Sequence, residues 1–254
     1  MSQTIAISGK GGSGKTTLAG LVIRTLVERT DKSVLAVDAD PNACLGATLG
    51  IEVEQTVGEI RDAALQRTLQ TGPGMDRERA VEYAIHRAVA EAHGFDLLAM
   101  GHTEGPKCYC AVNNLLRKYL DRAAGDYAWV VLDNEAGMEH LSRRTTDAVD
   151  LLVVVAEPTP IGAKTAHRIL GLAERLPVTI QQKGVVWNKV TDPSRLAALA
   201  GDLPVLASVP MDPAVAEASM AGTPVFGLPA DCPALDAVGH VLAETLAVPA
   251  PQPS

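Results

Sequence analysis

The chain has 254 residues and a formal net charge of −8, with 47% hydrophobic and 20% charged residues. This composition is typical of a folded α/β domain and excludes a disordered chain, while the acidic balance argues against a nucleic-acid partner, because phosphate neutralisation needs clustered Lys and Arg. No apolar run approaches the ~18–20 residues of a membrane span and no signal peptide precedes the first strand, so we expect a cytoplasmic protein without a membrane partner.

Short apolar segments alternate with helical patterns along the chain. The predicted strands are Thr4–Ser8, Ser33–Asp38, Asp96–Met100, Trp129–Asp133, Leu151–Ala156, Gly184–Trp187 and Val205–Val209. The predicted helices are Thr16–Arg29, Arg77–His93, Val112–Ala123, Pro160–Leu176, Pro193–Ala200 and Cys232–Leu246. The strands are nearly continuous in Val, Ile, Leu and Ala, which indicates a parallel sheet buried on both faces.

This alternation predicts a doubly wound, mostly parallel α/β sheet with helices on both faces, whose ligands bind at the carboxyl ends of the strands. We expect a single domain over residues 1–248 and a flexible Pro-rich tail over residues 249–254. Residues 50–94 give the weakest pattern, with a loop at Gly72–Gly74.

A phosphate-binding loop follows the first strand, with the sequence G-K-G-G-S-G-K-T-T at residues 9–17. It fits the pattern G-x-x-x-x-G-K-[ST] and has the preceding strand and following helix that the motif requires. Its glycines let backbone N–H groups turn toward phosphate oxygens, Lys15 would reach the β- and γ-phosphates, and the Thr16 hydroxyl would ligate Mg²⁺. A plain glycine-rich turn is the alternative. The expected nucleotide-binding residues are Gly11, Gly12, Ser13, Gly14, Lys15, Thr16 and Thr17.

A second lysine, Lys10, gives the loop the form K-G-G-x-G-K-T. This deviant phosphate loop resembles that of the MinD/ParA/nitrogenase-iron-protein group of ATPases. In that group the extra lysine crosses a dimer interface and contacts phosphate on the partner's nucleotide. The resemblance therefore implies ATP as the nucleotide and a homodimer in which Lys10 acts in trans, like an arginine finger. An ordinary solvated lysine is the alternative.

Two acidic segments follow apolar strands. The segment V-D-A-D-P-N at residues 37–42 places Asp38 and Asp40 where carboxylates are costly unless they meet a cation or hydrogen-bond donors. It resembles the D-x-D-P segment of the same group, which implies that Asp40 positions the attacking water and Asp38 lies near Mg²⁺; a turn after an edge strand is the alternative. The run W-V-V-L-D at residues 129–133 has the Walker-B pattern, which aims Asp133 at Mg²⁺-bound water.

Two further strand ends resemble base-binding elements of this group. An asparagine at the position of Asn188 reads the adenine edge there, although a plain turn residue would also fit. The segment Val209–Asp212 resembles the element whose backbone and proline, here Pro210, flank the base.

The four cysteines do not form a disulfide framework in a chain of this length. Cys108 and Cys110 form a C-x-C pair, and thiolates suit Zn²⁺, Cu⁺, Ni²⁺ or an iron–sulfur cluster. Because two ligands rarely satisfy a metal, we expect a two-fold axis to join two pairs as a four-sulfur site for nickel or zinc at a dimer interface. Redox-active or buried thiols are the alternatives, and His102 could be an extra ligand or a solvated loop histidine.

With this pair the resemblance narrows to the carbon monoxide dehydrogenase maturation ATPases, the CooC family. It is carried by the C-x-C pair and the helix after it, by D-N-E-A-G-M-E-H-L-S-R at residues 133–143 and by E-P-T at residues 157–159. It covers residues 4 to about 246 and is poorest between residues 50 and 94. It implies an ATP- and metal-controlled dimer that assists nickel insertion into carbon monoxide dehydrogenase or a related nickel enzyme.

Two other functions remain open. A MinD/ParA-like switch would organise a surface or partner, but the chain ends in a Pro-rich segment instead of a basic amphipathic helix. An iron–sulfur reductase like the nitrogenase iron protein would need paired cysteines spaced tens of residues apart, whereas Cys108 and Cys110 are two apart.

Overall fold

The computed structural model describes residues 2–66, 69, 77–102, 118, 125–135 and 148–249. Several predicted features lie outside this part of the chain: the loop at Gly72–Gly74, the cysteine pair Cys108 and Cys110, the helix Val112–Ala123 apart from Lys118, and the tail from residue 250. No helix in the described ranges is both long and apolar enough to cross a membrane.

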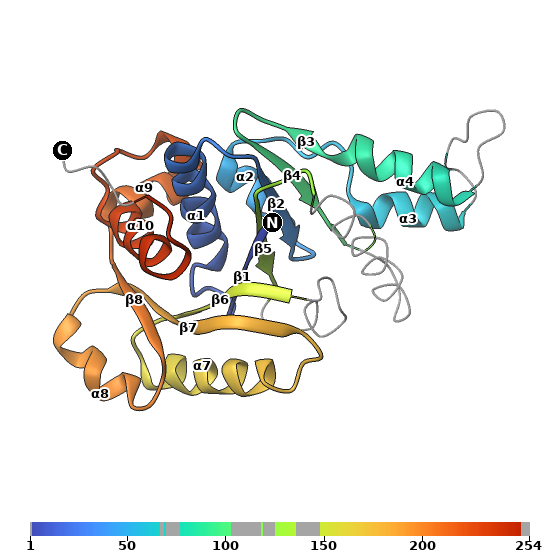
Figure 1. Ribbon diagram of the computed structural model, residues 1–254. Helices are drawn as coiled ribbons and strands as arrows, with labels where there is room; N and C mark the ends of the chain where they lie inside the picture. The colour runs from blue at the N-terminus through green and yellow to red at the C-terminus, as the bar shows by residue number, and fades with distance from the viewer. Residues whose placement is uncertain are drawn as a thin grey trace.

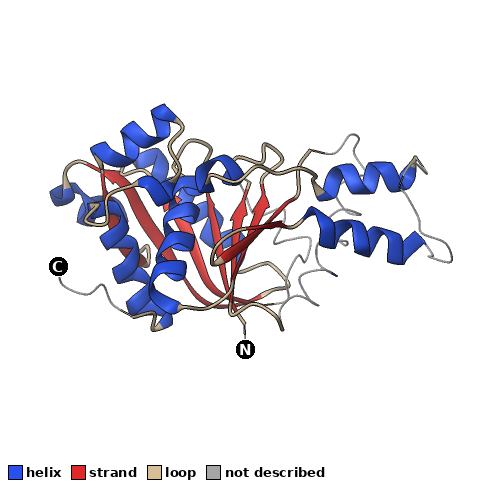
Figure 2. Ribbon diagram, turned by 90° about the horizontal axis from the view of Figure 1, so that it is seen from above, coloured by secondary structure: helices blue, strands red, loops and turns tan. Residues whose placement is uncertain are grey.

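A single eight-stranded sheet organises the described residues, in the order β3-β4-β2-β5-β1-β6-β7-β8 (Figure 2). Its neighbouring strands pair in parallel, except β3 with β4. The strands are β1 (Gln3–Gly9), β2 (Val34–Ala39), β3 (Ala90–Glu91), β4 (Phe95–Ala99), β5 (Trp129–Asn134), β6 (Ala148–Ala156), β7 (Thr179–Val190) and β8 (Val205–Pro210). The predicted doubly wound, mostly parallel sheet is confirmed.

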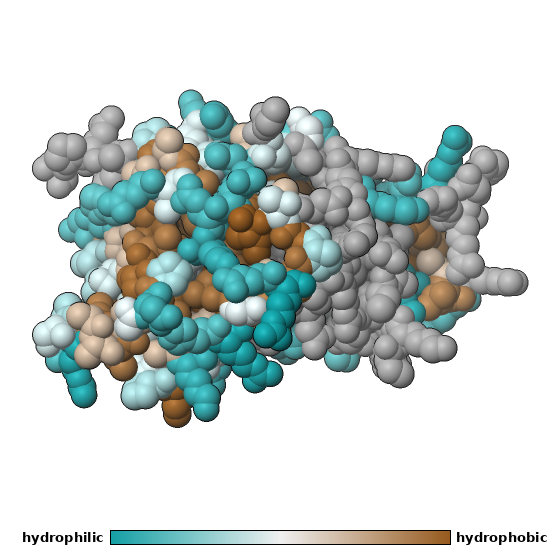
Figure 3. Space-filling view, turned by 60° about the horizontal axis from the view of Figure 1, so that its bottom comes forward, coloured by the Kyte–Doolittle hydropathy of each residue, from teal (hydrophilic) through white to brown (hydrophobic). Residues whose placement is uncertain are grey.

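Helices cover both faces of the sheet (Figures 1 and 2). The α-helices are α1 (Lys15–Thr30), α2 (Leu45–Leu49), α3 (Val57–Leu65), α4 (Arg77–Ala88), α7 (Pro160–Ala173), α8 (Leu196–Ala200), α9 (Pro213–Ala221) and α10 (Pro233–Leu246). Two short 3₁₀-helices are η1 (Pro193–Arg195) and η2 (Val225–Gly227). The face that carries α7 and α8 shows apolar side chains between polar and charged ones (Figure 3).

Two separate cores follow from the alternation of side chains along each strand. Ile5 and Ile7 of β1 pack in the cluster that includes α1 and α10, whereas Ala6 between them belongs to the cluster that includes α3, α4 and α7. Because successive strand residues point to opposite faces, an uninterrupted apolar strand serves both cores. This burial on both sides explains why the strands were readable as continuous apolar runs.

The parallel register brings the acidic strand ends together. Asp38 of β2 lies opposite Asp133 of β5, and Asp133 in turn lies opposite Ile7 of β1. β1 ends two residues later, where the phosphate-binding loop begins. The loop and both carboxylates therefore lie together at the carboxyl ends of the strands, as is typical of parallel α/β sheets.

The region between residues 50 and 94 differs from the sequence prediction. The helix predicted over Arg77–His93 ends at Ala88, and Ala90–Glu91 instead forms β3, antiparallel to β4. A tight turn makes this possible, because Gly94 adopts a left-handed φ of 88° and the Ala92 N–H donates to Phe95 O at 2.9 Å. The helices α2, α3 and α9 were also not predicted, and the predicted helix Pro193–Ala200 begins as η1 before α8.

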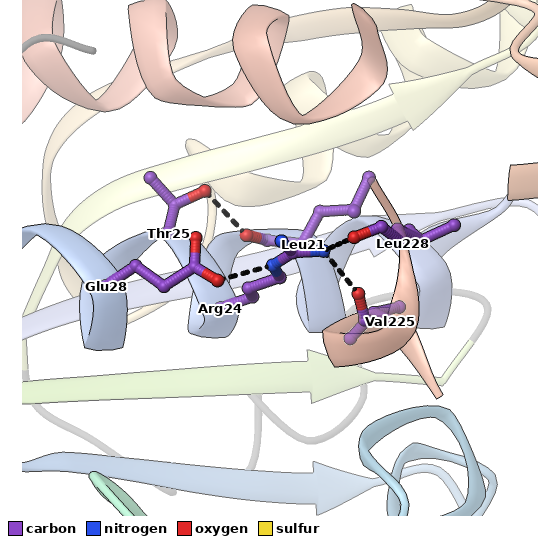
Figure 4. A network of polar contacts seen from close by, with 6 residues as sticks. All are labelled: Leu21, Arg24, Thr25, Glu28, Val225 and Leu228. Atoms are coloured by element: carbon purple, nitrogen blue, oxygen red, sulfur yellow. Dashed lines mark hydrogen bonds and ion pairs between the residues drawn. The ribbon is translucent and has the colours of Figure 1, made fainter. Parts of the chain in front are cut away.

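A buried arginine ties α1 to η2 (Figure 4). The Arg24 guanidinium donates to the carbonyls of Val225 and Leu228 at 2.7 and 2.8 Å and to the Glu28 carboxylate at 2.7 Å. Buried carbonyl groups need hydrogen-bond donors, and the Arg24 guanidinium supplies one to each of these two. The contact holds the segment after α9 against the helix that follows the phosphate-binding loop.

Candidate functional site

The phosphate-binding loop joins β1 to α1 as a tight glycine-rich connection. Gly12 and Gly14 have left-handed φ values of 81° and 91°, which favour glycine. At Gly9 a Cβ atom would lie 2.3 Å from the carbonyl oxygen of Val155 in β6, so close backbone approach requires glycine there. Ser13 turns the loop back on itself, since its N–H and its Oγ both donate to Lys10 O, at 3.2 and 2.8 Å. The loop predicted from sequence is thus formed by the strand, turn and helix that the motif requires.

The two consecutive residues Asn188 and Lys189 of β7 bind this loop from outside. Asn188 Nδ2 donates to Ser13 O at 2.8 Å, and Lys189 Nζ donates to Gly12 O at 2.8 Å. The Lys189 ammonium also forms an ion pair with the Glu157 carboxylate at 2.8 Å. Lys189 was not predicted as a site residue; its position directly after Asn188 was the one available signal.

Two carboxylates are buried next to the loop. Asp38 is 0% exposed and accepts hydrogen bonds from the N–H groups of Leu45 at 2.8 Å and Asp40 at 3.1 Å. Asp133 is 1% exposed, and neither of its carboxylate oxygens accepts a hydrogen bond of normal geometry from any residue the structure describes. An ionised carboxylate in this state is costly without a cation.

The pKa values of both carboxyl groups reflect this burial. Desolvation raises the pKa of Asp38 to about 7, with the negative charge of Asp133 adding to the effect and the two backbone donors opposing it. Desolvation also raises the pKa of Asp133 to about 6, although the Thr16 hydroxyl and the Lys15 ammonium lower it. The Thr16 hydroxyl and Lys15 therefore lie on the Asp133 side of the site.

This donor set fits Mg²⁺. A hydroxyl and buried carboxylate oxygens are the hard ligands that Mg²⁺ prefers, and it commonly takes one or two carboxylates together with substrate phosphates. Among the described residues no group of three or more His, Cys, Asp or Glu could hold a metal by itself, so nucleotide phosphates would have to complete the site. Thr16 and Asp133 would hold the ion, with Asp38 beside them.

Asp133→Asn should stabilise the nucleotide-free protein at pH 8 by about 1–3 kcal/mol. The pKa of Asp133 is raised on folding, so folded-state stability falls as pH rises from the unfolded value near 4 through about 6. The gain should therefore be full at pH 8, fall as pH drops through about 6, and vanish below the unfolded value near 4. Urea unfolding without Mg²⁺ measures it, with the exposed Asp202→Asn as control; equal stabilities of the variant and the unmodified chain at pH 8 would contradict the burial cost.

Asp40 lies at the start of the segment that leaves β2. Its carboxylate accepts hydrogen bonds from the backbone N–H and the side-chain amide of Asn42, at 3.0 and 2.8 Å. β2 lies between β4 and β5, so the alternative of a turn after an edge strand is wrong. The role of Asp40 in positioning water stays a prediction.

The predicted base-binding residues line one cavity of about 140 Å³. Gly14, Thr17, Asn188 and Pro210 all contribute to its wall. One N–H of the Asn188 amide donates to Ser13 O, and the carbonyl oxygen of the same amide could accept from an adenine amino group. Reading of adenine by Asn188 stays a prediction.

A buried aspartate that the sequence analysis did not single out, Asp212, also lines this cavity. Its carboxylate accepts from the N–H groups of Ala214 and Ala234 and from the Cys232 thiol, at 2.9, 3.1 and 3.0 Å. Burial acts to raise the pKa of Asp212, but these hydrogen bonds outweigh it and the pKa is lowered. One carboxylate thus caps the starts of both α9 and α10 and fixes the wall of the cavity.

Lys10 is exposed at a second cavity, of about 350 Å³, between the phosphate-binding loop and the start of α7. Glu157 and the half-exposed start of α7 line its other side, including Ile161, whose side chain is 66% exposed. No described residue forms an ion pair with the Lys10 ammonium. Its predicted contact with a partner's nucleotide concerns a second chain and stays a prediction.

The metal-binding prediction lies mostly outside the described residues. Cys108 and Cys110 are not described, and the described His102 is exposed. Of the other cysteines, Cys44 is exposed and Cys232 is buried.

Comparison with known proteins agrees with this site. Residues 4–225 match the family described as the CobQ/CobB/MinD/ParA nucleotide binding domain. The chain is 42% identical over 232 residues to an uncharacterized ATP-binding protein of Methanocaldococcus jannaschii, covering 89% of this chain and 91% of that protein. It is 33% identical over 246 residues to the carbon monoxide dehydrogenase accessory protein CooC of Rhodospirillum rubrum, covering 90% and 91%.

A solved structure with the same fold is the septum site-determining protein MinD of Pyrococcus horikoshii, in complex with Mg-ADP. It superposes with a TM-score of 0.71 at 22% identity, covering 97% of this chain and 98% of that one. At this identity the similarity shows the fold alone.

Proposed function

Since the chain belongs to the CobQ/CobB/MinD/ParA family of nucleotide-binding domains, we propose that it is a Mg²⁺-dependent ATPase that acts as a metallochaperone. Its cargo would be nickel, delivered to carbon monoxide dehydrogenase or a related nickel enzyme, and its working form would be a homodimer. The observation that carries the ATPase part is the buried Asp133 carboxylate, whose oxygens accept no hydrogen bond of normal geometry among the described residues and which lies next to Lys15 and Thr16.

In the proposed reaction, the loop backbone and Lys15 bind the phosphates. Thr16 and Asp133 would hold Mg²⁺, which would supply positive charge next to the phosphates. Asp40 orients the attacking water in line with the γ-phosphate, and Lys10 of the partner chain stabilises charge in the transition state. Asn188 and Pro210 hold the base in the cavity beside α9.

The metal-handling part rests on the C-x-C pair and on the 33% identity to CooC over nearly the whole chain. Cys108 and Cys110 of two chains would supply four thiolates to one Ni²⁺, with Zn²⁺ as the alternative ion.

Among the last described residues before the cysteine pair, Met100 and Gly101 are held firmly beside the candidate nucleotide site. Met100 N–H donates to Asp38 O at 2.8 Å, and Met100 O accepts from Gly58 N–H at 2.9 Å. At the next residue, Gly101, a Cβ atom would lie 2.4 Å from Thr56 Oγ1, so the chain is packed closely against the start of α3. Met100 is thus hydrogen-bonded to the backbone of Asp38, one of the two buried carboxylate residues.

Titration of Ni²⁺ into the reduced protein with ATP tests the proposal. We expect one ion per dimer, loss of binding in the double variant Cys108→Ala/Cys110→Ala, and normal binding in the control Cys44→Ala. Affinity should fall as pH drops, because the cysteine thiols, whose ordinary pKa is about 8.5, must lose their protons before they bind the metal.

A stoichiometry of one ion per monomer, or unchanged binding in the double variant, would place the site elsewhere. ATP-dependent pelleting with lipid vesicles or DNA, without metal binding, would favour a MinD/ParA-like switch instead. Brown colour after anaerobic purification, with absorbance near ~400 nm, would favour an iron–sulfur reductase.

A further inference from the structure

The end of β7 holds two consecutive carbonyl groups of the phosphate-binding loop. Lys189 Nζ donates to Gly12 O, and Asn188 Nδ2 donates to Ser13 O, both at 2.8 Å. The Lys189 ammonium is anchored on its other side by Glu157 at the end of β6, also at 2.8 Å. The lysine therefore bridges the loop to a second, neighbouring strand.

Neighbouring residues of a regular strand point to opposite faces, so both side chains reach the loop only because the strand is irregular here. The pairing of β7 with β8 shifts register between Trp187 and Val190, and Lys189 has a left-handed φ of 60°. Such a conformation is uncommon for a residue with a Cβ, and strained or bulged positions of this kind cluster at functional sites. The irregularity turns the Lys189 ammonium back over the loop.

The loop needs external anchors because its own backbone is permissive. Residues 9–14 include four glycines, two of them with left-handed φ, and glycine loses more conformational freedom on ordering than any other residue. In a planar trans peptide the N–H points away from the C=O. Holding Gly12 O outward therefore keeps Ser13 N–H turned inward, where it donates to Lys10 O at 3.2 Å and closes the turn. Holding Ser13 O outward directs Gly14 N–H inward in the same way.

We propose that Lys189 is a positioning residue for nucleotide binding: it contacts no phosphate itself but holds the Gly12–Ser13 peptide in the turn that Lys10 O closes, so that the loop keeps the shape in which its other N–H groups face the β- and γ-phosphates. The location of Lys189 between two cavities supports this role. Lys189 and Gly14 line the cavity of the predicted base-binding residues, whereas its partners Gly12 and Glu157 line the cavity at Lys10. The inference rests on the proposed nucleotide-binding function and adds a residue to it.

Three substitutions separate the ammonium group from the backbone strain. Lys189→Met removes the charge, Lys189→Gly removes the side chain and relieves the left-handed φ, and Lys189→Arg keeps a cationic donor. A matched control exists on the same strand: Lys183 pairs with Glu174 at 2.8 Å, as Lys189 does with Glu157, but does not contact the loop. Lys183→Met therefore loses a similar ion pair without touching the loop.

Titration with Mg-ADP should show a dissociation constant about tenfold higher for Lys189→Met and Lys189→Gly, as expected for loss of one charge-assisted hydrogen bond. Lys189→Arg should restore most of the affinity, and Lys183→Met should bind as the unmodified chain does. At saturating ATP the turnover of Lys189→Met should stay within about twofold of the unmodified rate, because the bond orders the ground state and the transition state alike.

Hydrogen exchange without nucleotide gives a readout independent of activity. Amides of the loop peptide containing Ser13 and Gly14 should exchange faster in Lys189→Met, while β1 and β5 keep their protection. Lys189→Gly should keep the melting temperature of the unmodified chain or raise it, so its lower affinity cannot be attributed to unfolding.

Unchanged Mg-ADP affinity in Lys189→Met, or loss of affinity only in proportion to lost folded protein, would overturn the role of Lys189 while leaving the proposed function intact. Absence of Mg-ADP binding by the unmodified chain would instead overturn the proposed function, and with it this inference.

Discussion

Asp40→Ala should leave Mg-ATP binding unchanged and lower ATP turnover by about 10²–10⁴-fold, the usual contribution of a positioned acid–base group. The carboxylate stands at the start of the segment after β2, where Asn42 donates to it twice, and its charge is close enough to raise the pKa of Asp133. Positioning of water acts mainly in the transition state, so the loss should appear in turnover and not in binding.

Single-turnover hydrolysis and equilibrium binding of ATP, measured on the same preparation, separate the two effects. The control Asp202→Ala removes an aspartate whose side chain is 91% exposed and lies 3.5 Å from His167, away from the loop. A normal rate for Asp40→Ala would assign the water to another group; weaker ATP binding at a normal rate would make Asp40 a ligand-binding residue.

The location of the site was predictable because parallel strands carry their chemistry at one end. Four motifs each follow an apolar strand: those at Gly9, Asp38, Asp133 and Asn188. The parallel sheet brings the carboxyl ends of these strands to the same side. Long buried strands give a strong local signal, and the spacing of the loop from Asp133 adds a second one. No long-range information was needed to place these residues together.

Elements with little local signal were missed. β3 has two residues, too few for a periodic pattern, and exists because the turn at Gly94 returns the chain to β4. α9 does carry a start signal, since Asp212 caps it and Pro213 is its first residue, but this segment was interpreted as part of the base-flanking motif. Asp212 also caps α10, but through a hydrogen bond from Ala234, which lies 22 positions away in the sequence.

Lys189 shows which site residues cannot be predicted from local sequence patterns. Its partners are Gly12, 177 positions away, and Glu157, 32 positions away, so no sequence window contains the contact. The backbone irregularity that aims its side chain arises from the pairing of β7 with β8, which is likewise set by the whole sheet. Contacts of this kind follow from the fold and become visible only once the strands are in register.

Lys10→Ala should weaken ATP-dependent dimerisation and lower hydrolysis by about 10³–10⁵-fold, the range for a transition-state charge supplied in trans. Lys10 is exposed and has no ion-pair partner among the described residues, while the adjoining cavity at the start of α7 leaves its surroundings open. Binding of Mg-ADP to the monomer should be retained, because the loop carbonyl of Lys10, and not its side chain, takes part in the turn with Ser13.

Light scattering with ATP, in the hydrolysis-deficient Asp40→Ala background, measures dimerisation. Lys32→Ala, which removes an exposed lysine just after α1, is the matched control and should dimerise normally. A Lys10→Ala protein that dimerises and hydrolyses ATP normally would remove the trans-lysine hypothesis.

Mixing Lys10→Ala with Asp40→Ala distinguishes action in trans from action in cis. If Lys10 acts on the partner's nucleotide and Asp40 on its own, a mixed dimer has one complete site, in the Lys10→Ala subunit, which keeps Asp40 and receives Lys10 from its partner. At a protein concentration high enough to keep both variants dimeric, random pairing of equal amounts makes half of the dimers mixed, so activity should recover to about a quarter of the unmodified rate. If Lys10 acts in cis, both sites of every mixed dimer lack one residue and the mixture stays inactive. That result would show that Lys10 does not act across the dimer interface.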